Sequence, residues 1–333
     1  MKLASLKHGR DGRLVVVSRD LTWAVDERSI APTMQVALEN WDEVADKLTA
    51  LFDALQAGKA ADAFAFDPAQ AAAPLPRAYQ WLDGSAFTAH GDLMVQAFRL
   101  KENPQPPGAP LIYQGGSDDF LGPRDDAPFP SEEQGVDFEG EFAVVLSDTP
   151  MGVSRQQAPR FVRLLMLAND WSLRALAPGE MKTGFGWLQS KPSTSFSPVA
   201  VTPDELGASW KDGRIHLPLL VYWNDGDFGR PSGAAMTFDF YHLIEHAAAT
   251  RRLRAGTILG SGTVSEGAPD KVGSACIAEQ RGFETLYQGG PKTPFMKFGD
   301  RVRMEALDPA GASIFGAIDQ KVARASMPSV SGE

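Results

Sequence analysis

Two glutamates separated by one residue, Glu139 and Glu141, carry the clearest potential for chemistry in this sequence. They lie in the segment VDFEGEFAVVL (residues 136–146), whose apolar residues predict a half-buried strand. Side chains at i and i+2 project from one face of a strand, so both carboxylates should converge at roughly 7 Å spacing. Two like charges there need a counter-charge, and carboxylates suit Mg²⁺, Ca²⁺ or Mn²⁺. A solvent-facing edge with both glutamates pointing outward is the alternative.

A second acid and a base follow in the segment RLLMLANDWSLR (residues 163–174). Asp170 and Arg174 come immediately after a continuous apolar run, which predicts a buried strand that ends at a site.

The elements around these residues indicate a β-rich α+β protein. Residues 1–35 predict short strands, the clearest over 13–18, and the apolar spacing over 40–57 predicts one amphipathic helix. The stretch 60–76 is rich in Ala, Pro and Asp and is typical of a linker. We therefore expect a small N-terminal β domain over 1–77 and a catalytic domain over 78–333, with helices only near 155–163 and 238–248.

Composition excludes several classes of function. The 333 residues are 43% hydrophobic and carry a net charge of -10, which argues against a nucleic-acid or anionic-membrane partner. Cys276 is the only cysteine, so neither an internal disulfide nor a cysteine-based zinc cluster is expected. No export signal or bilayer-spanning run is apparent, and we expect a cytoplasmic protein. His242 and His246 have helical spacing for a metal but fit ordinary exposed histidines better.

Together the motifs resemble the signature of the fumarylacetoacetate hydrolase superfamily, an E-x-E strand followed some thirty residues later by N-D-x-S-x-R. The segment GFGWLQSK (184–191) is similar to the family's lysine segment, and SGTVS (261–265) to its S-G-T-x-S turn. The resemblance covers roughly residues 78–320. It implies a mixed β-roll or β-sandwich catalytic domain preceded by a small N-terminal β domain, as in the longer, fumarylacetoacetase-like members.

The resemblance also implies roles for particular residues. An aspartate with a histidine seven residues later, Asp83 and His90, precedes the segment YQGG that begins at Tyr113. By resemblance, the metal ligands are Asp83, Glu139, Glu141 and Asp170, and the catalytic residues are His90, Glu279, Lys191 and Arg174. His90 would be the general base oriented by Glu279, and Lys191 and Arg174 would meet the oxyanion. Ordinary salt bridging is the alternative for these two cations. Tyr113 and Thr263 would bind substrate.

The implied reaction is metal-dependent hydrolysis of a carbon–carbon bond in a 1,3-diketo acid. Fumarylacetoacetate or a related acylpyruvate of aromatic or tyrosine catabolism is the expected substrate, and a homodimer the expected assembly. Close fumarylacetoacetases carry tyrosine and glutamine where this chain has Ser85 and Ala177, so the substrate stays open, and the alignment around Met181 is loose. A 2-oxo acid isomerase, hydratase or decarboxylase is the alternative within the family. A non-catalytic binding scaffold is the rival outside it.

Overall fold

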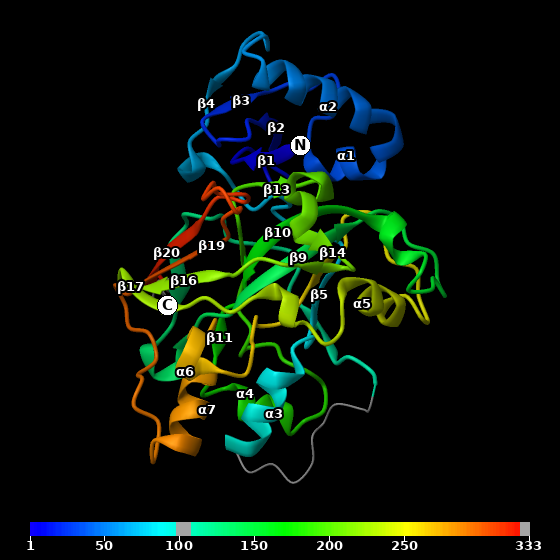
Figure 1. Cartoon of the computed structure of the whole chain (residues 1–333). Coiled ribbons are helices and arrows are strands. Elements are labelled where there is room, and N and C mark those ends of the chain that lie inside the picture. The colour runs from blue at the N-terminus through cyan, green and yellow to red at the C-terminus, as the bar shows by residue number, and fades with distance from the viewer. Residues whose placement is uncertain (98–107, 327–333) are drawn as a thin grey trace, which may run out of the picture.

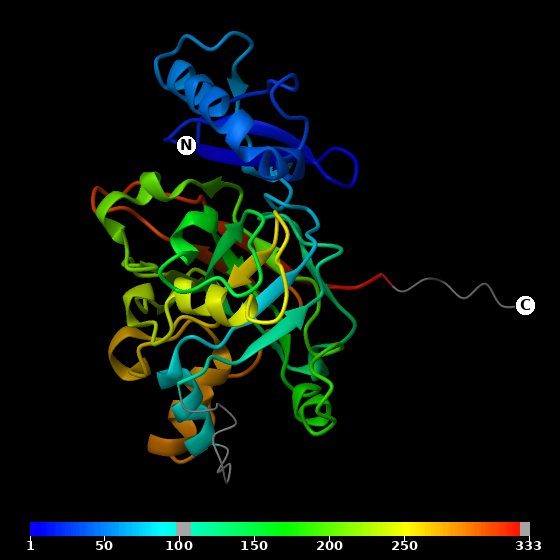
Figure 2. The ribbon, with the colours of Figure 1, turned by 90° about the vertical axis from the view of Figure 1, so that its right-hand side faces the viewer.

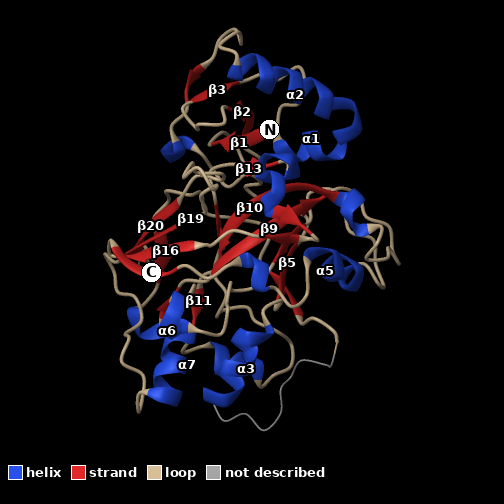
Figure 3. Cartoon of the chain, viewed as in Figure 1, coloured by secondary structure: helices blue, strands red, loops and turns tan. Residues whose placement is uncertain are grey.

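The computed structural model describes residues 1–97 and 108–326, so 98–107 and 327–333 of the expected catalytic domain lie outside the described residues. Strands dominate the described chain, and helices cover them at both ends (Figures 1 and 3). The strand-rich α+β prediction is confirmed.

One large sheet runs through the molecule. Its spatial order is β4 (Phe64–Ala65), β3 (Trp23–Val25), β2 (Arg13–Val17), β1 (Lys2–Leu6), β13 (Ala200–Val201), β10 (Val162–Asn169), β9 (Gly140–Leu146), β18 (Ile258–Gly260), β5 (Trp81–Gly84) and β6 (Ile112–Gly115), with β12 (Ser195–Phe196) paired to β10. A second sheet has the order β17 (Gly226–Gly229), β16 (Leu220–Trp223), β19 (Arg301–Glu305), β20 (Ile318–Arg324) and β7 (Ala127–Phe129). Two short ribbons join β11 (Ser172–Leu173) to β8 (Val136–Asp137) and β14 (Trp210–Lys211) to β15 (Arg214–Ile215).

The helices of the described residues are mostly short. They are α1 (Met34–Glu39), α2 (Trp41–Gln56), α3 (Thr88–Ala97), α4 (Ala177–Met181), α5 (Phe240–Ala247), α6 (Pro269–Val272) and α7 (Ile277–Tyr287). Short 3₁₀ segments lie at Pro68–Gln70, Glu132–Gln134, Ala158–Phe161, Pro203–Ser209 and Gly233–Ala235, and the segment Pro203–Ser209 is kinked at Gly207. Within the described ranges, no helix combines the length and apolar character needed to span a bilayer.

The N-terminal strands continue the central sheet instead of forming a sheet of their own. Strand β1 pairs with β13, with Leu3 opposite Ala200, and Figure 1 shows this unit with α1 and α2 at one end of the molecule. The predicted helix over 40–57 is α2, but the expectation of one helix was wrong. The Asn40 side chain donates to the Val36 carbonyl (2.9 Å) and separates α2 from the preceding α1. The boundary near 78 stays a prediction.

The predicted strand over 136–146 is interrupted at its acidic end. Strand β8 ends at Asp137 and β9 begins at Gly140, so Glu139 lies between them, opposite Cys276. Every residue of β9 is buried because it lies between β10 and β18 with both faces covered, which explains its continuous apolar run.

The prediction of helices only near 155–163 and 238–248 needs correction. The helix near 238–248 is confirmed as α5, but 155–163 forms only a 3₁₀ turn before β10 begins at Val162. Helices α3 and α7 were missed because each has an internal glycine and mixed polarity. They pack closely together at Gly282, where a Cβ atom would lie 2.6 Å from Leu93 Cδ2. Figures 1 and 2 show α3, α6 and α7 together at the end opposite the N-terminal unit.

Candidate active site

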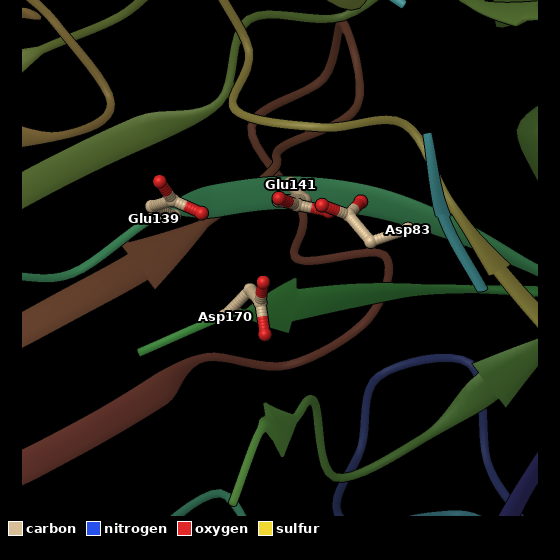
Figure 4. Close-up of side chains that lie close together, drawn as sticks. All are labelled: Asp83, Glu139, Glu141 and Asp170. Atoms are coloured by element: carbon tan, nitrogen blue, oxygen red, sulfur yellow. The ribbon is translucent and has the colours of Figure 1, made fainter. Parts of the chain in front are cut away.

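Four carboxylates meet where neighbouring strands of the central sheet end. Asp83 is in β5, Glu141 is in β9, and Asp170 directly follows β10, while Glu139 precedes β9. One ligand oxygen from each residue lies within 4.8 Å of the others, and all four side chains are buried. Figure 4 shows the four carboxylates facing a common point, with Asp83 and Glu141 beside each other.

Gly260 leaves space for this cluster. It lies in β18, between β5 and β9, opposite Asp83 on one side and Ala143 on the other. A Cβ atom at this position would lie 2.7 Å from Asp83 Oδ1 and 2.8 Å from Glu141 Oε2. The same Cβ atom would lie 2.4 Å from Trp81 Cη2, so a larger residue would force the Trp81 ring, the carboxylates or the strands to shift.

The negative charges of Asp83 and Glu141 are poorly compensated by the described residues around them. Both Glu141 oxygens are buried and receive no hydrogen bond from any described donor. Burial, and then the charge of Asp83, raises the pKa of Glu141 well above its ordinary value. Burial, and then the charge of Asp170, raises the pKa of Asp83 to about 8. Asp83 Oδ1 accepts a backbone hydrogen bond from Gly262 N at 3.0 Å. This half of the cluster needs positive charge.

Two cations compensate the other half. Lys191 Nζ donates to Glu139 Oε2 and to Asp170 Oδ2, both at 2.6 Å. Arg174 donates to Glu139 and, at 2.8 Å, to Asp137. Burial acts to raise the pKa of Glu139, but the charges of Lys191 and Arg174 outweigh it and bring that pKa to about 2. Burial acts to lower the pKa of Lys191, but Asp170 and Glu139 outweigh it and raise that pKa.

Tyr113 completes the surroundings of Lys191. Its hydroxyl donates to Asp170 Oδ2, and its ring meets the Trp187 ring edge-on with 5.0 Å between centroids. Lys191 Nζ lies 5.4 Å from the Tyr113 centroid and 5.9 Å from that of Trp187, within cation–π range. Thr194 Oγ1 donates to the other Asp170 oxygen at 2.7 Å.

The predicted base and its partner form a second group. His90, in α3, lies with Nδ1 3.6 Å from Glu279 Oε1, slightly beyond direct hydrogen-bond distance. Glu279 is in the first turn of α7, where the hydroxyls of Ser265 and Ser274 donate to it. Burial acts to raise the pKa of Glu279, but His90 and these hydroxyls outweigh it and lower the pKa. Glu279 is therefore an ionised partner for the imidazole.

A short segment joins the two groups. Gly260 lies against the Asp83 and Glu141 oxygens, and Ser265, five residues later, donates to Glu279. Thr263 lies between them and is buried. The predicted site residues thus gather in one region: the four acids with Arg174, Lys191 and Tyr113, and His90 with Glu279 at the other end of this segment.

The donor set fits a hard divalent cation. Only carboxylate oxygens make up the cluster, which suits Mg²⁺, Ca²⁺ or Mn²⁺. Four carboxylates face two cations, so two negative charges are in excess, and the orphaned Glu141 oxygens are free to act as ligands. Asp137 adds a fifth acid, but its oxygens also accept from Ile277 N and Ala278 N at the start of α7.

Comparison with known proteins identifies the chain. A family model described as the fumarylacetoacetate (FAA) hydrolase C-terminal region matches residues 80–323, and one described as fumarylacetoacetase N-terminal domain 2 matches residues 1–77. The chain belongs to the fumarylacetoacetate hydrolase family. The predicted family is confirmed.

Named relatives within this family differ in their reactions. The 2,4-didehydro-3-deoxy-L-rhamnonate hydrolase of Sphingomonas sp. strain SKA58 is 28% identical over 167 residues, which are 49% of this chain and 56% of that protein. The mitochondrial oxaloacetate tautomerase fahd2 of Xenopus laevis is 28% identical over 219 residues, 64% of this chain and 59% of that protein. Membership therefore leaves the reaction open between hydrolase and isomerase chemistry.

A solved structure has the same fold as this chain over nearly the whole length of both proteins. Maleylpyruvate hydrolase from Sphingobium sp. SYK-6, solved with manganese(II) and pyruvate, has a TM-score of 0.66 and covers 98% of this chain and 100% of its own, at 17% identity. Likeness at that identity concerns the fold alone.

Sequence reasoning missed several residues that shape this site: Asp137, Thr194, Gly260, Ser265 and Ser274. Asp137 had a local signal, because it stands two residues before Glu139 and so shares its side of an extended chain. Ser265 had a signal in the S-G-T-x-S turn, and Ser274 stands only five residues before its partner Glu279. Thr194 and Gly260 had no local signal, because their partners are distant in sequence.

Proposed function

We propose that this protein is a metal-dependent hydrolase that cleaves a carbon–carbon bond of a 1,3-diketo acid. Fumarylacetoacetate or a related acylpyruvate is the proposed substrate class. The observation that carries the proposal is a His90–Glu279 pair joined by one short segment to a buried cluster of four carboxylates. A metal-binding scaffold would need the cluster but has no need of a general base.

The proposed metal ligands are Asp83, Glu139, Glu141 and Asp170, with Mg²⁺, Ca²⁺ or Mn²⁺ as the ion. A divalent cation bound there supplies Lewis-acid chemistry, which polarises substrate carbonyls and stabilises an enolate. The solved maleylpyruvate hydrolase was determined with manganese(II), which supports a divalent ion in this fold.

His90 is the proposed general base and general acid. Its imidazole takes a proton from water, and the ionised Glu279 stabilises the imidazolium that forms. The water oxygen bonds to a carbonyl carbon of the diketo acid, and the bond from that carbon to the central carbon then breaks. The imidazolium returns the proton to the leaving carbon, so one water is consumed and an acid and a methyl ketone are released.

Lys191 and Arg174 are proposed to stabilise the oxyanion that develops on the attacked carbonyl. An ammonium has three N–H donors, and Lys191 uses two of them on Glu139 and Asp170, so one remains. Arg174 uses Nε and Nη2 on Asp137 and Glu139, which leaves Nη1. Tyr113 and Thr263 are proposed to contact the substrate.

An absorbance assay on a small panel of diketo acids, with Mg²⁺, Mn²⁺ or Ca²⁺ added, tests the proposal. We expect loss of the diketone chromophore and release of the two cleavage products. The tautomerase relative supports a second candidate, isomerisation of a 2-oxo acid. Tautomerisation or decarboxylation of oxaloacetate without cleavage of any diketo acid would overturn the hydrolase proposal in its favour. A homodimer remains a prediction for sedimentation analysis.

A further inference from the structure

We propose that Glu180 is a positioning residue of this site, whose carboxylate fixes the loop that presents Lys191. The inference rests on the proposed function, because it assigns Glu180 a role through a proposed catalytic residue. Glu180 belongs to α4, whereas Lys191 follows the exposed loop after that helix.

The Glu180 carboxylate binds three consecutive backbone N–H groups. Its Oε1 accepts from Gln189 N at 2.8 Å, and its Oε2 accepts from Leu188 N and Ser190 N, both at 3.1 Å. The Ser190 hydroxyl also donates to Oε2. These four contacts hold the chain up to the residue immediately before Lys191.

Apart from the contact of the Trp187 ring with Tyr113, apolar packing does little to hold the same loop. The Phe185 side chain is 98% exposed, Leu188 81% and Met181 54%. Gly184 and Gly186 have positive φ angles of 74° and 98°, a backbone conformation open mainly to glycine. Beside that contact of Trp187, the hydrogen bonds to Glu180 are the main restraint that the described residues supply at this end of the loop.

Ser190 connects the restraint to both cations of the site. Its N–H and hydroxyl bind Glu180, and its carbonyl accepts from Leu173 N at 2.8 Å, next to Arg174. Lys191 must place its ammonium 2.6 Å from two carboxylates at once. Because a shift of about 1 Å in a reacting group can reduce a rate by roughly 100-fold, loss of the clamp should be felt in turnover.

The clamp does not titrate where the enzyme is expected to work. The hydrogen bond from Ser190, followed by those from the backbone, lowers the pKa of Glu180 to about 2. Glu180 therefore stays ionised through the neutral range in which His90 would act. A substitution at Glu180 should lower turnover and leave the shape of the pH profile unchanged.

The test compares Glu180→Ala, Glu180→Gln, Lys191→Ala and the double variant Glu180→Ala/Lys191→Ala, each loaded with metal. We expect Glu180→Ala to lower kcat by roughly 10–100-fold, with metal content and pH profile as in the wild type. Glu180→Gln keeps one acceptor oxygen and should lose less. In the Lys191→Ala background, removal of Glu180 should cost less than about 2-fold, because residues that act through one another are non-additive.

Glu27→Ala is the matched control, since Glu27 Oε1 likewise accepts from a backbone N–H (Ser29, 3.1 Å) and from a serine hydroxyl in an exposed loop. Amide hydrogen exchange provides a readout independent of activity. Exchange over residues 188–190 should accelerate in Glu180→Ala and stay unchanged in Glu27→Ala.

Wild-type turnover in Glu180→Ala, equal losses in both Lys191 backgrounds, or unchanged exchange over 188–190 would each overturn the inference. If the wild-type enzyme cleaves no diketo acid, the proposed function fails by itself. The exchange measurement then still decides whether Glu180 holds the loop.

Discussion

Replacing Glu141 by glutamine should not destabilise the metal-free protein but should reduce the stability that the protein gains from metal. Both Glu141 oxygens are buried without a donor, and the ligand oxygens of the cluster lie within 4.8 Å of one another. Burial and the charge of Asp83 raise the pKa of Glu141 well above its ordinary value of 4.5, so the metal-free folded protein must hold a proton there at pH 7, which costs about 3 kcal/mol relative to an exposed carboxyl. Glutamine keeps the shape and avoids this cost. Without metal, Glu141→Gln should be as stable as the wild type or up to about 3 kcal/mol more stable.

Metal should shift the difference in stability by about 2.3 kcal/mol in favour of the wild type. An ion at 100 times its dissociation constant stabilises the folded protein by about 2.7 kcal/mol. Substituting an outer-shell residue typically costs 10–100-fold in metal affinity, and a direct ligand should cost at least as much. If Glu141→Gln weakens binding 100-fold, the same metal concentration stabilises the variant by only about 0.4 kcal/mol.

Thermal unfolding in EDTA and over a titration of Mg²⁺ or Mn²⁺ measures both effects, with metal content by elemental analysis. Glu43→Gln, on the exposed face of α2, is the control and should behave as the wild type throughout. Wild-type metal content in Glu141→Gln would refute the assignment of this ligand. A variant that is strongly destabilised in EDTA would refute the reasoning about uncompensated charge.

Three further predictions concern the base, the space beside the metal site and pH. His90→Ala should lower kcat by about 10²–10⁴-fold with metal content unchanged, and adding Glu279→Gln should cost little more if the two residues act as one unit; additive losses in kinetic assays would separate them. Gly260→Ala should lower the metal affinity measured by calorimetry, because the new Cβ atom would lie 2.7 Å from Asp83 Oδ1. An unchanged affinity would show that the strands move apart enough to accommodate the methyl group. Burial lowers the pKa of Lys2 from 10.5 to about 8, so the unfolded chain holds this proton at pH values where the folded chain has lost it. Stability should therefore rise by about 3 kcal/mol between pH 8 and 10.5, and a Lys2→Met variant that kept this rise in urea unfolding would contradict the assignment.

Local patterns in the sequence were sufficient for several elements of the fold. The sequence predicted the β-branched strand at 13–17, the buried runs of β9 and β10, and the amphipathic helices α2 and α5. These elements were predictable because a strand or helix that buries one or both faces must repeat its apolar residues. Helices α3 and α7 were not readable, since they are stabilised mainly by close contact with each other at Gly282. Tertiary packing decides such helices, and intrinsic propensity does not.

The residues of the candidate site also fall into two groups, those that the sequence predicted and those that only the structure revealed. Glu139, Glu141 and Asp170 were visible as charges at the ends of apolar runs, because burying a carboxylate without a purpose is costly. Asp83 and His90 came from the order of motifs, since a lone aspartate and histidine carry no local signal. The pairing of His90 with Glu279 was expected from the resemblance, whereas the position of Gly260 against two carboxylates and the hold of Glu180 on the Lys191 loop came only from the tertiary structure. These contacts depend on which strands become neighbours and in what register, and that is set by packing among residues far apart in the chain.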